Sequence, residues 1–231
     1  MTKKPEIVKE EDLIKRRFGI YYKKNSESPF IGEVQDYYHE NGRLRIKKSY
    51  KDGKLDGPSK FFFKKGRLEE RIEYVNGKRE GIREQYFKNR QLSSRAYFVD
   101  DLVDGLYIFY HENGQLRGKW QYKKGVAVGY WETFYENGQL EEAENFNSVG
   151  ERQGLHETYY ETGQIDCRSN YRKGKTHGLV EFFHEDGGLY RTENWKNGKR
   201  DGLSEWFDDY GNPITTTTWE NGKFIEGVTQ I

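Results

Sequence analysis

Five histidines are the first residues of this sequence that could bind a metal ion or transfer a proton. His39, His111 and His184 recur at nearly equal intervals along the chain. His156 and His177 are closer together, and Glu157 follows the first of them. Two imidazoles and a carboxylate are a ligand set that zinc accepts. Whether any of these side chains meet depends on the elements that carry them.

One glutamate recurs along the chain, as Glu84, Glu132, Glu157, Glu181 and Glu205. Two carboxylates held close together could act as a general acid and a general base. A catalytic pair would occur once, however, whereas this acid returns at regular intervals. We therefore expect a ladder of carboxylates paired with Lys or Arg.

These candidates lie in a repeated phrase whose clearest copy runs from Gly105 to Leu116. Aligning the copies on the residue that follows Gly-x gives steps of 24 residues, with 25 at two places. The aligned column is Leu44, Leu68, Leu92, Leu116, Leu140, Ile165, Leu189 and Ile214. Glycines form a second column, at Gly57, Gly81, Gly105, Gly129, Gly154, Gly178, Gly202 and Gly227. Such periodicity is the signature of a repeat protein.

Each repeat contains two short runs rich in aromatic and polar residues, separated by Asn-Gly, Asp-Gly or a similar pair. These pairs accept positive φ and are strong β-hairpin signals. Asn89–Arg90 lacks the glycine, so we expect strain or another turn type there. The turns are too short for crossover helices, so consecutive strands must pair antiparallel. The prediction is an all-β fold: an elongated, twisted, single-layer antiparallel β-meander of about eight 24-residue hairpin repeats.

We divide the chain into an N-terminal segment with a degenerate capping hairpin, residues 1–34, and a repeat array, residues 35–231. One repeat advances a sheet by about 9.6 Å, so histidines three repeats apart lie roughly 29 Å from each other. His156 and His177 occupy different columns of neighbouring repeats. The glycines mark hairpin turns and precede no helix, so no phosphate loop is implied. We expect no catalytic residues, no metal and no cofactor, and hence no enzyme.

The only cysteine, Cys167, rules out an intramolecular disulfide and a multi-cysteine metal site. It could be a reactive thiol. Because it belongs to no paired motif, we expect a half-buried structural thiol instead.

The motif itself resembles a known family. Residues Tyr135 to Leu140 read Tyr-Glu-Asn-Gly-Gln-Leu, and Tyr-x-x-Gly-Lys followed by Asp-Gly or Glu-Gly occurs elsewhere in the chain. This pattern looks like the MORN-repeat variant of YwqK-type antitoxin-like bacterial proteins, and it extends from about Phe30 to Gly227. The resemblance implies a repeat scaffold and, more specifically, an antitoxin-like or immunity-like protein that sequesters a toxin. The alternative is a general structural or membrane-associated interaction scaffold with no toxin partner.

The charge is distributed unevenly although the net charge is only +1. Residues 1–99 carry an excess of ten positive charges, residues 100–170 an excess of seven negative charges, and residues 171–231 an excess of two negative charges. Solvation of exposed turns would explain such runs. The sharper hypothesis is an acidic centre that receives a basic protein, with tryptophans as anchors. The predicted partner-binding residues are Tyr107, Trp120, Trp131, Glu132, Glu136, Glu141, Glu142 and Glu144.

Nucleic acid and membrane are the competing partners. Basic residues lie near aromatic residues in the N-terminal third, an arrangement that can bind single strands or anionic lipid. The basic residues concerned are Arg43, Arg45, Lys47, Lys48, Lys51, Lys64, Lys65 and Arg67. The repeat columns already use these aromatics, and nucleic-acid binders are usually strongly basic overall. We rank both partners below a protein. With no signal peptide or transmembrane stretch in the sequence, we expect a cytoplasmic protein.

Overall fold

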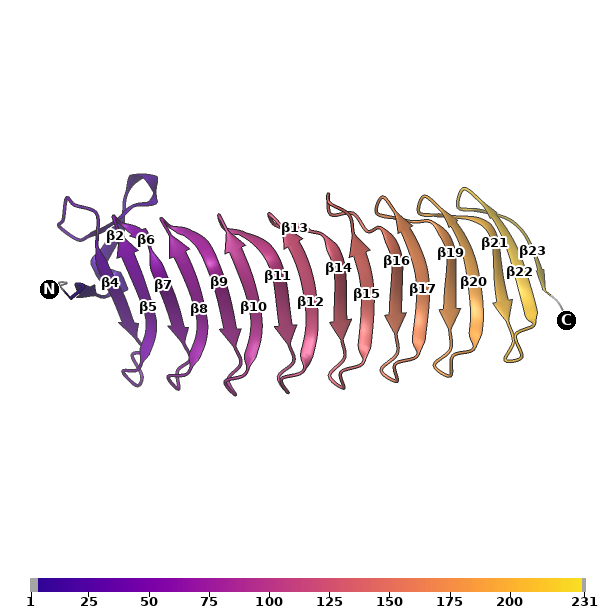
Figure 1. The fold of residues 1–231 in the computed structure, drawn as a ribbon, viewed down its shortest axis with the longest axis horizontal. Helices are drawn as coiled ribbons and strands as arrows, with labels where there is room; N and C mark the ends of the chain where they lie inside the picture. The colour runs from indigo at the N-terminus through magenta and orange to yellow at the C-terminus, as the bar shows by residue number, and fades with distance from the viewer. Residues whose placement is uncertain (1–3, 230–231) are drawn as a thin grey trace. The chain divides into compact units, whose positions relative to one another are not determined.

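The computed structural model describes residues 4–229, so the first three residues of the predicted N-terminal segment and the last two of the predicted array lie outside it. The chain divides into two compact units, the first ending at Gly114 and the second beginning at Gln115. Each is built almost wholly of antiparallel β-hairpins (Figure 1). The all-β hairpin meander predicted from the sequence is confirmed within each unit. No helix among residues 4–229 is long and apolar enough to span a membrane.

The first unit begins with short elements that precede its main sheet. They are β1 (Ile7–Val8), the 3₁₀ turn η1 (Glu10–Asp12), β2 (Leu13–Lys15), the 3₁₀ turn η2 (Arg17–Gly19) and β3 (Tyr21–Lys23). β2 and β3 pair with each other, and β1 lies parallel to the first strand of the main sheet. That sheet comprises β4 (Gly32–Tyr37), β5 (Leu44–Lys51), β6 (Lys54–Leu55), β7 (Gly57–Phe62), β8 (Leu68–Val75), β9 (Lys78–Tyr86), β10 (Leu92–Val99) and β11 (Leu102–Tyr110). Because β4 pairs with β5, Gly32 to Val34 already belong to the first hairpin.

The second unit continues the same pattern in chain order. Its strands are β12 (Leu116–Lys123), β13 (Val126–Ala127), β14 (Gly129–Phe134), β15 (Leu140–Phe146), β16 (Gly154–Tyr159), β17 (Ile165–Arg172), β18 (Lys175–Thr176), β19 (Gly178–Phe183), β20 (Leu189–Lys196), β21 (Lys199–Phe207), β22 (Pro213–Glu220) and β23 (Lys223–Thr229). When the two-residue strands β13 and β18 are left aside, every strand from β14 onward pairs antiparallel with the preceding strand.

Tyrosine and asparagine side chains at some of the hairpin turns link one repeat to the next through hydrogen bonds to main-chain carbonyls. The Tyr135 hydroxyl donates to the Tyr159 carbonyl at 2.6 Å, and the Asn137 amide donates to the Glu161 carbonyl at 2.7 Å. Tyr38 makes the same bond in the first unit, to the Phe62 carbonyl at 2.6 Å. The asparagine also accepts from the N–H two residues on, which fixes an Asx turn. Side-chain contacts one repeat apart therefore lock the turns in step.

Two departures from the predicted columns have a clear cause. Opposite Phe207, the pairing register places Pro213, where Leu189 stands opposite Phe183 in the preceding hairpin. Pro213, and not the predicted Ile214, is therefore the column residue, and the step from Leu189 is 24 residues. In the turn that lacks glycine, Arg90 adopts φ 82°, a left-handed conformation that side chains other than Asn or Asp rarely take.

Successive residues of a strand point to opposite faces, and residues paired across strands share a face. We call one of these the ladder face. The charged residues in its central row are Lys47, Lys60, Arg71, Glu84 and Arg95 in the first unit and Lys119, Glu132, Glu157, Arg168, Glu181 and Glu205 in the second. The other is the core face, because it carries most of the buried residues. In the first unit these are Val34, Ile46, Ser59, Ile72, Ser94, Ala96 and Phe98, and in the second Glu144, Ser169, Val180, Glu193 and Ser204.

Candidate functional site

The recurring glutamates form ion pairs on the ladder face, as the sequence predicts. Glu84 lies 2.6 Å from Arg95, Glu132 lies 2.5 Å from Lys119, and Glu157 lies 2.9 Å from Arg168. Arg168 also reaches Glu181 at 3.6 Å. Glu205 has no ion pair among residues 4–229, because its cross-strand neighbour is Thr192. The acids therefore sit in a ladder, without the paired carboxylates of an acid–base site.

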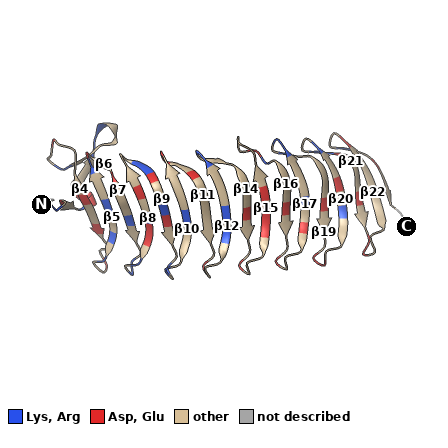
Figure 2. Ribbon diagram, viewed as in Figure 1, with Lys and Arg blue, Asp and Glu red and all other residues tan. Residues whose placement is uncertain are grey.

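The balance of charge on this face differs between the units. Figure 2 marks the charged positions along the strands of each unit. In the first unit, cross-strand pairing aligns Lys47, Lys60, Arg71 and Arg95 in the central row of the ladder face, with Glu84 as the acid in that row. In the second, the acid column is complete, whereas Ala143 and Thr192 stand where a cation would pair. The ladder face is thus predominantly basic in the first unit and acidic in the second.

An exposed apolar column runs beside the ladder on the same face. Each member follows the column glycine by one residue and leaves 42–51 % of its surface in solvent. The members are Ile82 and Leu106 in the first unit and Tyr130, Leu155, Leu179 and Leu203 in the second. Asparagines lie across from three of those in the second unit, at positions 145, 170 and 194. Sequence reasoning missed this column, although its 24-residue period was a signal that could have found it.

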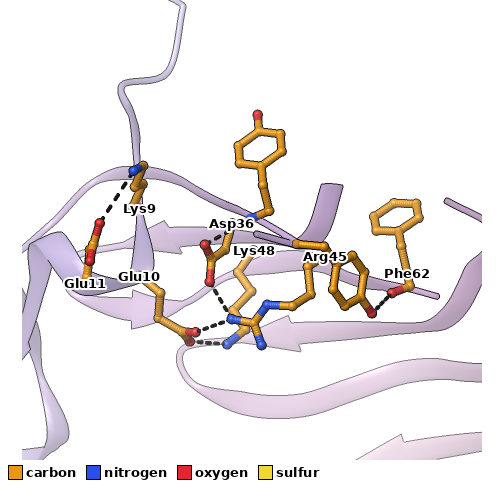
Figure 3. A network of polar contacts seen from close by, with 9 residues as sticks. Lys9, Glu10, Glu11, Asp36, Arg45, Lys48 and Phe62 are labelled. Atoms are coloured by element: carbon orange, nitrogen blue, oxygen red, sulfur yellow. Dashed lines mark hydrogen bonds and ion pairs between the residues drawn. The ribbon is translucent and has the colours of Figure 1, made fainter. Parts of the chain in front are cut away.

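The basic cluster of the first unit is largely occupied by contacts within the protein. Figure 3 shows Arg45 between the carboxylates of Asp36 and Glu10, with Lys48 also on Glu10 at 2.8 Å. The Arg45 guanidinium holds the pKa of Asp36 below its usual range. Lys47 pairs with Glu33 at 2.9 Å. Fewer cations are therefore free for a nucleic acid than the sequence suggests.

The predicted partner-binding residues lie on different faces and segments. Tyr107 belongs to β11 of the first unit, and the other seven belong to the second. Trp120 and Trp131 stack on the core face, with ring centroids 4.9 Å apart. Of the five acids, Glu132 lies on the ladder face, Glu142 and Glu144 lie on the core face, Glu136 lies in a turn, and Glu141 is exposed at a β-bulge. The structure thus divides the acidic centre between two surfaces.

A compact charged cluster occupies the core face between β15 and β16. His156 Nε2 lies 2.8 Å from Glu142 Oε1, and its Nδ1 lies 3.2 Å from Ser169 Oγ. Arg152 Nε lies 2.6 Å from Glu144 Oε2. The bond from His156 lowers the pKa of Glu142, whereas burial raises the pKa of Glu144 despite its arginine partner. These four charged or titratable groups meet although the sequence placed them in different columns.

A related cluster lies two repeats further on the same face. Glu193 is 1 % exposed, pairs with Arg191, and lies 2.7 Å from Arg200. The Trp195 indole N–H donates to the same carboxylate at 2.8 Å. Two guanidiniums and an indole therefore satisfy one buried carboxylate, as a buried charge requires.

Three of the remaining candidates for chemistry, His177, His184 and Cys167, are part of the packed structure. The Asn197 N–H donates to His177 Nδ1 at 3.5 Å, so this imidazole supports a turn of the next repeat. The ring of His184 packs on Tyr190 at 4.5 Å between centroids. Burial, with a smaller effect of Asp166 and Glu181, raises the pKa of Cys167 to about 11. The thiol is partly buried and protonated at neutral pH, as expected of a structural cysteine.

Comparison with known proteins agrees with the repeat pattern. The family model of the MORN repeat variant matches residues 35–52, 103–124, 127–148, 152–173 and 176–197. No curated protein matches the chain. Among solved structures, a porin-like protein from Bacteroides uniformis ATCC 8492 is similar at 9 % identity, over 85 % of this chain and 93 % of that chain, with a TM-score of 0.19. A TM-score this low supports no inference. These five segments, each within the hairpin fold, are therefore similar to repeats of the MORN variant.

Proposed function

We propose that this protein is a non-enzymatic scaffold that binds a protein partner through the ladder face of its second unit. The exposed apolar column carries this proposal. Tyr130, Leu155, Leu179 and Leu203 repeat along one face and are 42–49 % exposed. Single exposed apolar residues are ordinary, but an aligned series beside polar residues is typical of an interaction site.

Charge on this face favours a basic partner. The acid column lies two residues along each strand from the apolar column, and Glu205 has no cation beside it within the described residues. Neighbouring members of the apolar column are two strands apart, or about 9.6 Å. A partner with apolar side chains and a basic rim would match both columns, and its charge would speed the encounter. Glu132 is the predicted partner-binding residue that belongs to this surface.

The finer proposal is an antitoxin-like or immunity-like role, supported by the resemblance of the motif to that family. Its mechanism would be steric and electrostatic: the sheet covers the functional surface of a basic toxin without reacting with it. We place this encounter in the cytoplasm. No residue of the scaffold is assigned a chemical step.

The second candidate is a membrane-associated scaffold. The first unit combines Lys60, Arg71 and Arg95 with exposed Ile82 and Tyr97 on its ladder face. Cations beside exposed apolar groups suit an anionic lipid surface. Ion pairs already engage Arg71 and Arg95, so this candidate ranks second.

Parallel purification of tagged wild-type protein and a Leu179→Asp, Leu203→Asp variant from the host tests the proposal. We expect one basic, near-stoichiometric protein with the wild type. The variant should recover at least about tenfold less of the captured protein, since each buried apolar contact contributes on the order of 1.4 kcal/mol to binding. A Tyr210→Asp variant is the matched control, because Tyr210 is 92 % exposed but lies outside the column.

The captured protein is then expressed alone and together with each scaffold variant. Toxicity that the wild type relieves and the column variant does not would support the antitoxin-like role. A captured protein that is not toxic would be consistent with the scaffold proposal but would reject the antitoxin-like role. Equal capture by wild type and column variant would reject this surface, and recovery on phosphatidylserine vesicles alone would favour the membrane alternative.

A further inference from the structure

The charged cluster between β15 and β16 has the composition and spacing of a metal site. One ligand atom from each of Glu142, Glu144 and His156 lies within 4.8 Å of the others. The register pairs Ala143 with Glu157, which places Glu144 opposite His156 on the core face. Bonds of about 2.1 Å to one ion need donor atoms roughly 3–4 Å apart, which small side-chain rotations would provide. We propose that Glu142, Glu144 and His156 bind a zinc-class divalent cation, independently of any protein partner.

Neighbouring contacts already orient the ligands. Ser169 Oγ lies 3.2 Å from His156 Nδ1. When an ion is bound, the Nδ1–H would donate to that hydroxyl, and Nε2, which lies 2.8 Å from Glu142 Oε1, would give its lone pair to the ion instead of donating a proton to Glu142. Such an outer contact is typical of metal-binding histidines. Arg152 holds Glu144 through Oε2, so Oε1 is the oxygen that we assign to the ion. Arg152 thereby acts as an outer-shell partner of a ligating carboxylate.

The charge of the cluster also favours a cation. Two carboxylates face one guanidinium, since Arg152 is 2.6 Å from Glu144 and 3.9 Å from Glu142. With a neutral imidazole, the group carries one net negative charge in a partly buried place. A bound dication would stabilise both carboxylates, and the imidazole adds a nitrogen ligand that first-row transition metals prefer.

The Glu193 cluster provides an internal comparison. Glu193 occupies the position of Glu144, but Arg191 and Ser204 stand at the positions of Glu142 and His156. In that copy one carboxylate faces two guanidiniums. The copy therefore lacks both the second carboxylate and imidazole ligands and the net negative charge. Among residues 4–229, the metal-like set thus occurs at one copy and breaks the repeat symmetry, as a specific site does and a solvated ladder does not.

An ion can reach the cluster from solvent. The Glu142 side chain is 34 % exposed, whereas those of Glu144 and His156 are 11 % and 14 % exposed. The ion would therefore enter beside Glu142 and be shielded on its inner side. It would join β15 to β16 at the base of the enlarged turn that contains Asn147 to Gly150.

Calorimetric titration of tag-free, EDTA-treated protein with zinc chloride tests this site. We expect one equivalent to bind, and each of Glu142→Gln and His156→Gln to weaken binding by at least about tenfold, the scale already seen for outer-shell losses. Matched controls are His177→Gln, which removes an imidazole elsewhere, and Glu157→Gln, which removes the carboxylate next in sequence to His156 but on the ladder face. Circular dichroism checks that each variant retains its β-structure.

Cobalt(II) provides a second readout, because its visible absorption reports a nitrogen and oxygen ligand set directly. The wild type and both controls should develop the same d–d bands, and the Glu142→Gln, His156→Gln double variant should not. Failure of the wild type to bind zinc would overturn the proposal. A double variant that binds zinc or cobalt as the wild type does would also overturn it. So would a titration with magnesium chloride that releases the same heat of binding as the titration with zinc chloride.

Discussion

The two units share their turns and differ in the residues that fill the core face. In the first unit, Phe30, Val34 and Tyr50 form an apolar cluster, and Ile72 and Phe98 are also buried there. In the second unit, the same face buries Glu144 and Glu193 with arginine partners. The hairpin therefore does not depend on one kind of core. Its period comes from the turns and from main-chain hydrogen bonds, which are the same in both.

An apolar core and buried ion pairs have different consequences for stability. Apolar burial is tolerant of small changes and needs no exact partner. A buried ion pair gains little over a hydrophobic replacement, yet the loss of one partner is costly because the other charge stays behind. The second unit should therefore be more sensitive to single charge deletions, and the first to loss of apolar volume.

The largest effect should come from Glu193→Ala. It leaves Arg191 and Arg200 facing each other without their carboxylate, which should lower the free energy of unfolding by about 3–5 kcal/mol. Denaturant unfolding measures the loss, and hydrogen exchange locates it in β20 and β21. Glu226→Ala, at an exposed carboxylate, is the control. A decrease in the free energy of unfolding of less than about 1 kcal/mol would contradict this prediction, because it is the size expected for a surface ion pair.

A smaller loss should follow Val34→Ala in the first unit. Val34 is 0 % exposed, and its deletion removes about two methyl groups from a packed cluster, at a cost of about 2 kcal/mol. The same denaturant measurement applies, with exchange expected in β4 and β5. Because no charge is involved, the loss should not change between low and high salt. A marked salt dependence would contradict an apolar core.

Removal of the tyrosine contact between repeats should cost the same in both units. Tyr38→Phe and Tyr135→Phe each delete one hydroxyl bond to a carbonyl of the next repeat, worth about 1 kcal/mol. Tyr210→Phe, at an exposed side chain, should have no effect. Unequal losses at Tyr38 and Tyr135 would show that the turn contact is not the feature common to the two units.

The smallest effect should be a difference in response to acid. The pKa values of Glu33 and Asp36 are lowered, by Lys47 and Arg45 respectively, so their stabilisation is present above the ordinary carboxyl pKa and lost as pH falls toward the lowered values. In the second unit the raised pKa of Glu144 acts oppositely and offsets the lowered pKa of Glu142, since its unfavourable charge disappears on protonation. Hydrogen exchange between about pH 6 and pH 3, spanning the ordinary carboxyl pKa values, should show the larger loss of protection in the first unit. An equal loss would contradict this assignment.

Much of the fold follows from local signals that are visible in the sequence. Asn-Gly pairs select hairpin turns, and short turns leave antiparallel pairing as the solution. The repeat period, the strand class and the glutamate ladder were therefore predictable. Even the departure at Arg90 was visible, because the turn requires a positive φ and the sequence has arginine where the other repeats have glycine.

The faces of the sheet could not be read in the same way. A β-bulge between Thr133 and Phe134 places two residues against one, so Glu141 falls in the bulge and Glu142 aligns with Thr133. One residue of slip moves every side chain to the other face. The excess of acidic residues in this segment grouped Glu132 with Glu142 and Glu144, whereas the sheet places Glu132 on the opposite face from the other two.

The sequence by itself determined a repeat of hairpins, because each turn is encoded within a few adjacent residues. The tertiary structure alone decided that Pro213 replaces Ile214 in its column, that the apolar column lies beside the acids, and that His156 meets Glu142, Glu144 and Arg152. These outcomes depend on the register between strands, which bulges shift by single residues. Contacts across strands are therefore set by geometry that no local motif contains.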